Sequence, residues 1–347
     1  AILNTMQVDA CLLKGMDNIF YLTGFHGSEG TLFVTKGDLF LLTDFRYITH
    51  AQEATRGIKI VEIRDKKNIL GELCNQYDIR RIGFDSLHTT FFTFKQWSEA
   101  LKNVELIPLD TTIEEIRKNK EPEEIDSIVK AIDVATQAFT DIFNTIRPGL
   151  TEKEVANNLD YAMRRLGAEG PSFPTIVASG PRAALPHAEP TDRKIRDGEM
   201  VIIDFGAQVD GYCSDETCTL SIGDVNGKMQ DIYAIVNSAK QLALDKTRVG
   251  IPMKEVDMIV RGYIDEAGYG NFFRHGTGHG VGIAVHETPA INSTGDGLLE
   301  EGMVITIEPG IYIPNLGGVR LEDMLLITAD VPRVLTRIRK DELRVKV

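Results

Sequence analysis

The chain has 347 residues, a formal net charge of −13 and a composition that is 43% hydrophobic and 26% charged. This length is enough for a large core and for two domains. The acidic balance argues against a nucleic-acid partner and against docking on an anionic membrane. No apolar run approaches the ~18 residues of a membrane span, and the first residues show no secretory pattern. We therefore expect a cytoplasmic protein, whose four cysteines, without Cys-x-x-Cys spacing, are reduced and buried.

Residues 1–112 predict an α/β domain, because short strands alternate with helices. Strands are expected at 9–13, 30–35, 39–43, 58–63, 80–84 and 104–107, and helices at 48–55, 68–77 and 93–102. The segment Lys36-Gly37-Asp38 joins two of these strands and predicts a hairpin. Nothing in this domain has catalytic spacing, although His26 lies in a glycine-rich loop that could approach a site.

Residues 120–347 predict a second domain, which follows a charged boundary segment. Helices are expected at 123–146, 151–166, 228–247 and 253–267. Pro122 followed by acidic residues is typical of a first helical turn. Thr151 and Glu154 have the spacing of a capping box, which predicts the start of the second helix. His187 follows a proline in the loop after that helix and is a candidate site residue, although a lone loop histidine is usually just solvated.

Residues 200–220 predict a β-hairpin that turns at Asp210-Gly211, because both central positions of a type I′ turn need positive φ. In the register of that turn, Asp215 lies opposite Gly206, and Asp204 lies on the same face one diagonal step away. Diagonal partners are roughly 7–8 Å apart at the backbone. Two carboxylates that close repel each other unless a proton or a cation lies between them. Solvated acids on an exposed hairpin are the alternative, but the apolar run before Asp204 favours a metal.

Three of the seven histidines, His275, His279 and His286, fall within twelve residues. The glycines in and around 275–280 exclude a helix and predict a loop or tight turn with special backbone angles. A plain glycine-rich connector is the alternative. We favour a metal or acid–base role, because histidine is the commonest nitrogen ligand.

Residues 303–327 predict another hairpin, centred near Asn315, that sets Glu308 opposite or nearly opposite Glu322. Like charges directly opposite each other destabilise a sheet, and two unpaired acids facing inward would cost several kcal/mol. Asp323 has the opposite parity and should face away.

The second domain therefore repeats itself in outline. Residues 120–223 and 228–328 each predict two helices followed by a hairpin that carries two acids. Four carboxylates and His279 can hold two divalent ions about 3.5–4 Å apart. The oxygen-rich set favours Mn, Co or Fe over a thiolate-type zinc site.

The motifs that carry these residues are Ile-Asp-Phe-Gly-Ala, His-Gly-Thr-Gly-His-Gly, Ile-Glu-Pro-Gly and Arg-Leu-Glu-Asp. They resemble those of the pita-bread metallopeptidases, and among these aminopeptidase P and prolidase, which cleave Xaa–Pro bonds. Tyr-Leu-Thr-Gly-Phe and Thr43-Asp-Phe-Arg-Tyr47 resemble the creatinase-like N-terminal domain of the same enzymes. The resemblance implies an α+β fold, in which an α/β N-terminal domain precedes a pita-bread catalytic domain with a pseudo-twofold repeat. It also implies a homodimer and two divalent ions, manganese or cobalt in preference to iron or zinc.

Matched residue by residue, the resemblance implies roles. Asp204 would bind one ion, and Asp215 and Glu322 would bridge both. His279 and Glu308 would complete the second ion, and Glu308 would also pass a proton to the leaving proline nitrogen. The remaining matches surround the substrate: His187 and His286 at the tetrahedral intermediate and carbonyl, His275 beside the proline ring, and Tyr312 and Arg320 holding site and substrate.

Four alternatives differ from this prediction. Creatinase shares the fold but lacks the full ligand set, and methionine aminopeptidase usually lacks a domain like residues 1–112. A non-catalytic binding module would be expected to have lost ligands or supporting histidines. The fourth, an Xaa-Pro dipeptidase, must neutralise the product-side carboxylate of its substrate, whereas an aminopeptidase must leave room beyond proline. The Gly-Phe-His-Gly-Ser-Glu-Gly stretch around His26 resembles aminopeptidase P more closely, so we expect an Xaa-Pro aminopeptidase acting on proline-containing peptides.

Overall fold

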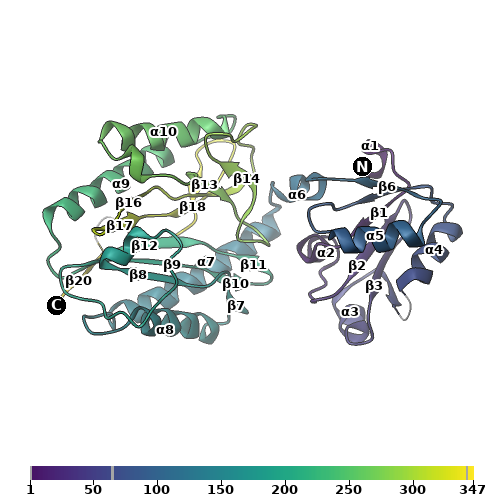
Figure 1. The fold of residues 1–347 in the computed structure, drawn as a ribbon, viewed down its shortest axis with the longest axis horizontal. Coiled ribbons are helices and arrows are strands. Elements are labelled where there is room, and N and C mark those ends of the chain that lie inside the picture. Colours follow the sequence, from purple (N-terminus) through teal and green to yellow (C-terminus); the bar gives the residue numbers. More distant parts are fainter. Residues whose placement is uncertain (1, 64–65, 341–342) are drawn as a thin grey trace. The chain divides into compact units, whose positions relative to one another are not determined.

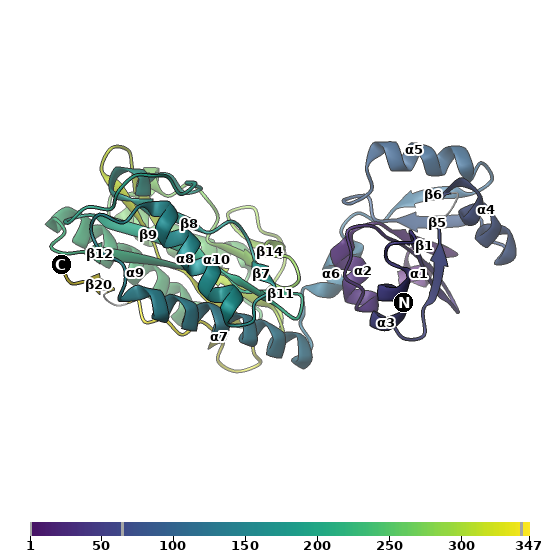
Figure 2. The ribbon, with the colours of Figure 1, turned by 90° about the horizontal axis from the view of Figure 1, so that it is seen from below.

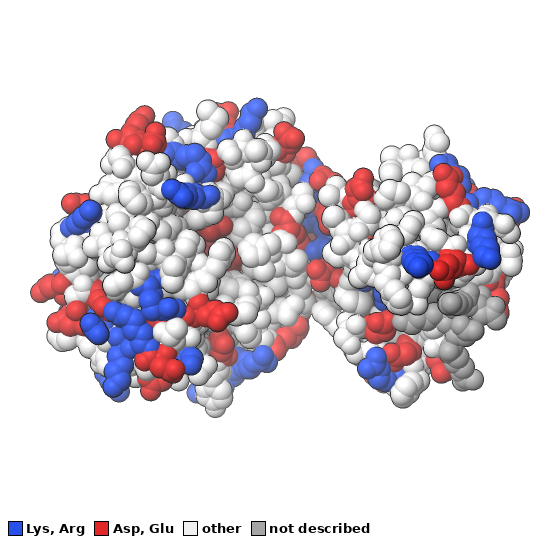
Figure 3. All heavy atoms as spheres, viewed as in Figure 1, with Lys and Arg blue, Asp and Glu red and all other residues white. Residues whose placement is uncertain are grey.

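A computed structural model describes residues 2–63, 66–340 and 343–347. The chain falls into two units, Ala1–Arg117 and Lys118–Val347, and both combine helices with sheets, as the α+β prediction requires (Figure 1). Acidic and basic side chains are interspersed over the face shown in Figure 3, so the net charge of −13 is not gathered in one acidic patch there. None of the helices in the described ranges combines the length and apolar character needed to cross a bilayer.

The first unit is built on a mixed sheet with the strand order β4-β3-β2-β1-β5-β6. Its strands are β1 Ala10–Leu13, β2 Thr31–Thr35, β3 Leu39–Thr43, β4 Lys59–Glu62, β5 Arg81–Phe84 and β6 Glu105–Pro108. Its helices are α1 Ile2–Thr5, α2 Met16–Thr23, α3 Ile48–Ala54, α4 Lys66–Gln76, α5 Phe91–Ala100 and α6 Thr112–Arg117. The predicted β2–β3 hairpin is present, and alternate strand residues enter the cores on the two faces of the sheet, Leu12 on one and Leu13 on the other. The sequence pattern does not predict α1, α2 or α6. Of these, α1 with four residues and α6 with six are too short to show a helical period.

The helices of the second unit are α7 Pro122–Phe143, α8 Glu152–Arg165, α9 Gly227–Lys246 and α10 Met253–Glu266, with short 3₁₀ turns η1 Gly180–Ala184 and η2 Gly270–Phe272. The predicted capping box of α8 is present, since Thr151 Oγ1 accepts a hydrogen bond from Glu154 N at 3.1 Å. The pairs α7/α8 and α9/α10 lie on opposite sides of the strands (Figures 1 and 2). Phe139 of α7 stacks on Phe205 at 5.3 Å between ring centroids, which anchors the Asp204 strand to its helix.

Two larger sheets form the centre of this unit, in the orders β20-β12-β9-β8 and β14-β13-β15-β18-β19, with smaller sheets β11-β10-β7 and β16-β17. The first half contributes β7 Gly170–Pro171, β8 Ile176–Ser179, β9 Met200–Phe205, β10 Ala207–Val209, β11 Tyr212–Cys213 and β12 Glu216–Ile222. The second half contributes β13 Gly278–Gly280, β14 Glu287–Ile291, β15 Val304–Ile307, β16 Gly310–Ile313, β17 Gly317–Arg320 and β18 Asp323–Leu326, and the chain ends with β19 Arg333–Val334 and β20 Arg344–Val345. Each half therefore has a helix pair and a long hairpin, which is the predicted repeat.

Both predicted hairpin registers are confirmed. Asp210 and Gly211 have φ values of 51° and 78°, and Val209 pairs with Tyr212. In the second hairpin, Asn315 has φ 64° and Ile313 pairs with Gly317. The turn residues thus set which side chains lie opposite each other many residues away.

The expected loop at 275–280 is wrong in part, because Gly278–Gly280 forms strand β13 between β14 and β15. The glycines serve close packing rather than unusual backbone angles. A Cβ on Gly278 would lie 1.9 Å from the carbonyl oxygen of Thr306, and a Cβ on Gly280 would lie 2.3 Å from that of Thr288. A strand can approach its neighbours this closely only where side chains are absent.

Candidate metal centre

Asp215, Glu308 and Glu322 lie where the two hairpins pass from one sheet to the next, whereas Asp204 lies within strand β9, opposite Thr217. The first ladder runs to Phe205–Glu216 and resumes at Gln208–Cys213, so that Gly206 and Asp215 lie in the gap. The second ladder ends at Ile307–Asp323 and resumes at Gly310–Arg320, which leaves Glu308 and Glu322 in the corresponding gap. The two halves of the repeat thus present their carboxylates from equivalent interruptions.

Backbone groups in these gaps bond to neighbouring segments of the chain. Glu308 N donates to Thr277 O at 2.8 Å, and Glu322 N donates to Thr217 O at 3.1 Å. Thr217 Oγ1 also donates to Glu322 Oε2 at 2.7 Å. Thr217 is a supporting residue that the sequence analysis missed, although its position two residues after Asp215 puts it on the same strand face.

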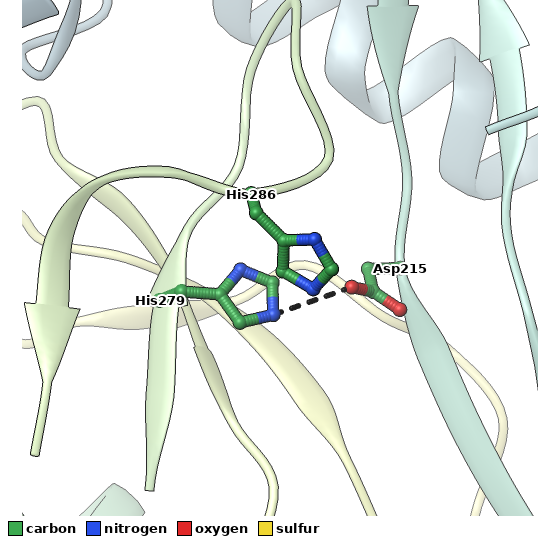
Figure 4. Close-up of side chains that lie close together, drawn as sticks. All are labelled: Asp215, His279 and His286. Carbon is green, nitrogen blue, oxygen red and sulfur yellow. Dashed lines mark ion pairs between the residues drawn. The ribbon is translucent and has the colours of Figure 1, made fainter. Parts of the chain in front are cut away.

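The five predicted ligands form overlapping groups whose ligand atoms lie within 4.8 Å of one another. The groups are Asp204, Asp215 and Glu322; His279, Glu308 and Glu322; and Asp215, His279 and His286. His279 Nε2 lies 3.6 Å from Asp215 Oδ2 and 3.5 Å from Glu308 Oε1. Figure 4 shows Asp215 facing the imidazoles of His279 and His286. Membership of His286 in a ligand group fits the metal or acid–base role favoured for the histidine cluster, whereas the family resemblance puts His286 at the substrate.

Asp215 and Glu322 are buried and Asp204 and Glu308 are half-buried, and among the described residues the four acids have only one cationic side chain beside them. Burial, followed by the charges of Glu322, Asp204 and Glu308, raises the pKa of Asp215 well above its ordinary value. Burial raises the pKa of Glu308 to about 8, despite the opposing charge of Arg320. Burial, followed by the charges of Glu308 and Asp204, raises the pKa of Glu322 as well. Such a set is relieved either by protons or by cations.

The guanidinium group of Arg320 is the cationic side chain beside the four acids. Among the described residues that line the pocket, Arg320 is the only Lys or Arg, and its Nη2 donates to Asp204 Oδ2 at 2.6 Å. The other oxygen, Asp204 Oδ1, is buried and has no hydrogen-bond partner among the described residues. An orphaned buried oxygen beside three other carboxylates suits divalent cations, whose ligands are oxygen atoms and imidazole.

His279 is in the protonation state that a ligand needs. Burial, followed by the charge of His286, lowers the pKa of His279 to about 4, so the ring is neutral near pH 7. Its Nδ1 lies 3.1 Å from the carbonyl oxygen of Gly280, which can only accept, so Nδ1 carries the proton. Nε2 therefore presents its lone pair to the carboxylates, as in metal-binding histidines oriented by a carbonyl.

A second hydrogen-bonded chain supports the site. Arg320 Nη1 donates to the hydroxyl of Tyr312 at 3.0 Å, and that hydroxyl lies 3.0 Å from His275 Nε2. Since His275 Nδ1 bonds the carbonyl of Gly276, Nε2 accepts from Tyr312. Burial, followed by the charge of Arg320, lowers the pKa of His275 to about 4. Arg320 Nη1 also donates to Pro186 O at 3.1 Å, which holds the loop that carries His187.

The pocket above the acids has a volume of about 580 Å³. The structure brings most of the predicted site residues to its wall: Asp204, Asp215, His279, Glu308, Glu322, His187, His275, His286 and Arg320. Tyr312 is not part of the wall and acts through His275 and Arg320. His187 and His286 are exposed, whereas Asp215 and Glu322 are buried, so the acids form the floor of the pocket and these histidines face its mouth.

Comparison with known proteins agrees with this geometry. Residues 126–329 match the model of metallopeptidase family M24, and residues 1–118 match the creatinase/prolidase N-terminal domain. The chain belongs to metallopeptidase family M24. This family assignment implies divalent metal ions, and the acid and histidine groups described above supply side chains that could hold them.

Relatives extend the likeness over nearly the whole chain. The chain is 37% identical over 338 residues to the Xaa-Pro dipeptidase of Pyrococcus furiosus, with 96% of this chain and 95% of that protein covered. The solved Xaa-Pro dipeptidase from Bacillus anthracis superposes with a TM-score of 0.95 at 36% identity, covering 99% and 97% of the two chains. The X-Pro aminopeptidase from Thermotoga maritima reaches a TM-score of 0.92 at 34% identity, covering 99% and 100%. The predicted fold, with its creatinase-like and pita-bread domains, and the predicted metallopeptidase family are therefore confirmed.

Proposed function

We propose that the chain is an Xaa-Pro dipeptidase that uses two divalent ions. The observation that carries the proposal is the likeness to the Xaa-Pro dipeptidases of Pyrococcus furiosus and Bacillus anthracis over almost the full length of both chains. These relatives favour the dipeptidase alternative over the aminopeptidase that the sequence around His26 suggests. The solved X-Pro aminopeptidase from Thermotoga maritima keeps the aminopeptidase as the second candidate.

In this proposal Asp204, Asp215, His279, Glu308 and Glu322 hold the ions. When bound, the ions would activate a water molecule and polarise the scissile carbonyl. The ligand set suits manganese or cobalt, as the sequence predicts. A homodimer and a cytoplasmic location stay predictions from the sequence.

The other pocket residues bind the peptide and move the proton. The exposed imidazoles of His187 and His286 can donate hydrogen bonds to the carbonyl oxygen as negative charge develops on it. Glu308, at the buried floor, accepts a proton from the attacking water and passes it to the proline nitrogen as that bond breaks. Burial and the nearby charge of Arg320 keep the pKa of His275 low and its ring neutral, Tyr312 holds the ring by a hydrogen bond, and the ring forms a wall for the proline.

Hydrolysis of matched peptides tests the proposal. Chelator-stripped protein is assayed with and without Mn²⁺ on Ala-Pro, Ala-Pro-Ala and Ala-Ala. We expect Mn²⁺-dependent cleavage of Ala-Pro alone. Cleavage of the tripeptide at its Ala–Pro bond would make the chain an aminopeptidase instead. Bound Mn²⁺ with no cleavage of any Xaa–Pro bond would contradict both, and Met-initiated peptides would then be the next substrates.

A further inference from the structure

A buried cluster of charged side chains lies behind the proposed bridging ligands. Because successive side chains of a strand face opposite sides, Glu216 and Asp323 point away from the pocket that Asp215 and Glu322 enter. Both are almost fully buried, with exposed fractions of 1% and 5%. Asp323 therefore faces away from the site, as its parity predicts, and takes part in this second cluster.

Lys340 joins the two strands at this point. Its Nζ donates to Glu216 Oε1 at 2.5 Å and to Asp323 Oδ1 at 2.7 Å. Its side chain is only 1% exposed. The Glu216 carboxylate has no other hydrogen-bond donor among the described residues, and its Oε2 has no partner there. A single ammonium group thus bonds one residue next to Asp215 and one residue next to Glu322.

The backbone around Lys340 makes the same connection. Strand β19 pairs with β18, whose first residue is Asp323. Strand β20 pairs with β12, whose first residue is Glu216. Lys340 lies between β19 and β20 in the chain, so the C-terminal segment is attached to both halves of the repeat and carries the lysine between them.

The forces on the two sides of these strands oppose each other. On the pocket side, Asp215 and Glu322 repel each other when ionised. On the other side, the buried ammonium group of Lys340 attracts both Glu216 and Asp323, and charge–charge interactions are strong in such buried surroundings. The distance between Asp215 and Glu322 therefore depends on two opposing forces. Their mutual repulsion separates the two strands, and the bonds of Lys340 on the far side of the strands hold them together.

We propose that Lys340 is a positioning residue that sets the separation of Asp215 and Glu322, and through it the affinity of the site for a pair of divalent ions. The proposal rests on the ligand set of the proposed function. Outer groups that hold metal ligands in place typically change metal affinity 10–100-fold when they are removed.

Lys240 provides a matched control. It belongs to the same cluster, its side chain is 6% exposed, and it forms an ion pair with Asp323. Its Nζ bonds Asp323 on one strand but not Glu216 on the other. Loss of either lysine removes a buried cation, but only loss of Lys340 removes the link between the strands.

The experiment compares Mn²⁺ binding by chelator-stripped wild type, Lys340→Met and Lys240→Met, using titration calorimetry together with melting temperatures. We expect both variants to melt at lower temperature. Lys340→Met should bind Mn²⁺ at least tenfold more weakly, while Lys240→Met should stay within twofold of wild type. Lys340→Arg, which keeps the charge, should recover part of the lost affinity.

If Mn²⁺ affinity falls equally in the two methionine variants, Lys340 only compensates buried charge and the proposal is overturned. Wild-type Mn²⁺ affinity in Lys340→Met would also overturn it. If Lys340→Met does not fold, the double variant Glu216→Gln/Lys340→Met removes both members of the ion pair. Wild-type Mn²⁺ affinity in this double variant would also overturn the proposal. Wild type that binds two Mn²⁺ ions but cleaves no Xaa–Pro bond would contradict the proposed function alone, and the lysine comparison would still decide this inference. Wild type that binds no Mn²⁺ would contradict both.

Discussion

The carboxylate of Asp215 is shared between two ligand groups, one with Asp204 and Glu322 and one with His279 and His286. It is 4% exposed and directly precedes β12, where the ladder to its partner strand is interrupted. Loss of a side chain that belongs to two candidate ligand groups should reduce the metal content more than loss of a side chain that belongs to one.

Asp215→Ala should therefore remove both ions, because the resemblance makes Asp215 a ligand that would bridge them. Elemental analysis after Mn²⁺ loading should fall from two ions per chain towards none. Asp210→Asn is the matched control, since Asp210 lies at the tip of the same hairpin, pairs with exposed Lys130 and keeps its positive φ as asparagine. Full metal content in Asp215→Ala would contradict the bridging assignment.

His286 has two candidate roles, and one substitution separates them. If it binds the substrate, His286→Ala should keep both ions and lose about 10²–10³-fold in kcat/KM, the range for removal of a hydrogen-bond donor to the developing oxyanion. Metal content and kcat/KM are measured on the same sample. Loss of one ion would make His286 a ligand, as its proximity to Asp215 and His279 allows. Unchanged kcat/KM would remove it from the mechanism. His50→Ala, at an exposed histidine of the first unit, should leave both quantities unchanged.

At the scale of single elements, the loop that carries His187 depends on one buried acid at the start of α8. Glu152 is 0% exposed. Its Oε1 accepts from Ser179 N at 2.9 Å and from Ser179 Oγ at 2.8 Å. Its Oε2 accepts from Arg182 Nε at 3.0 Å and from Thr191 N at 3.0 Å. The carboxylate thus holds both ends of the loop that places His187 at the pocket.

Glu152→Gln should lower kcat/KM about tenfold or more while both ions stay bound. The amide loses the charge and one acceptor, and a hydrogen bond to a charged group contributes about 1.5–3 kcal/mol. Steady-state kinetics and metal analysis check this. Glu154→Gln in the same helical turn is the control, because glutamine also completes a capping box. Equal loss in the two variants would point to the helix rather than the loop.

The hairpins were predictable from neighbouring residues because turn chemistry acts locally. Asp210-Gly211 and Asn315 have the positive φ that the turn types require, and strand alternation then assigns each side chain to a face. Strand β13 was not predictable in this way. Its three residues include two glycines, and what makes them a strand is close approach to Thr306 and Thr288 from other parts of the chain.

At the scale of the second unit, the acids of the two repeat halves meet in one site, so ions bound there would connect both halves. In the metal-free chain, burial raises the pKa of Glu308 to about 8 and also raises that of Asp215 and Glu322. The folded chain then holds protons that the unfolded chain releases near pH 4–4.5. These three acids therefore contribute stability that is lost as pH rises from about 4.5 to 8. His275 and His279, whose pKa burial lowers to about 4, oppose that loss only below about pH 6.5, the ordinary value for histidine.

Metal ions replace these protons, so the stability gained from Mn²⁺ should be larger at pH 8 than at pH 5.5. An ion at about 100 times its dissociation constant stabilises the folded state by about 2.7 kcal/mol per site. Thermal scans with Mn²⁺ or with a chelator at the two pH values measure the difference in melting temperature. An equal difference at both pH values, or a larger one at pH 5.5, would contradict proton displacement.

The sequence by itself determined the two domain types, the helix pairs, the two hairpins and the acids that face inward, because period, capping and turn chemistry are encoded within a few residues. The order of the motifs was also enough to identify the family. Tertiary structure alone decided that His286 approaches Asp215 and that Lys340 bonds Glu216, a residue 124 positions away. No local pattern encodes such contacts, because they depend on how separately formed strands come together and on which buried charges must then be matched.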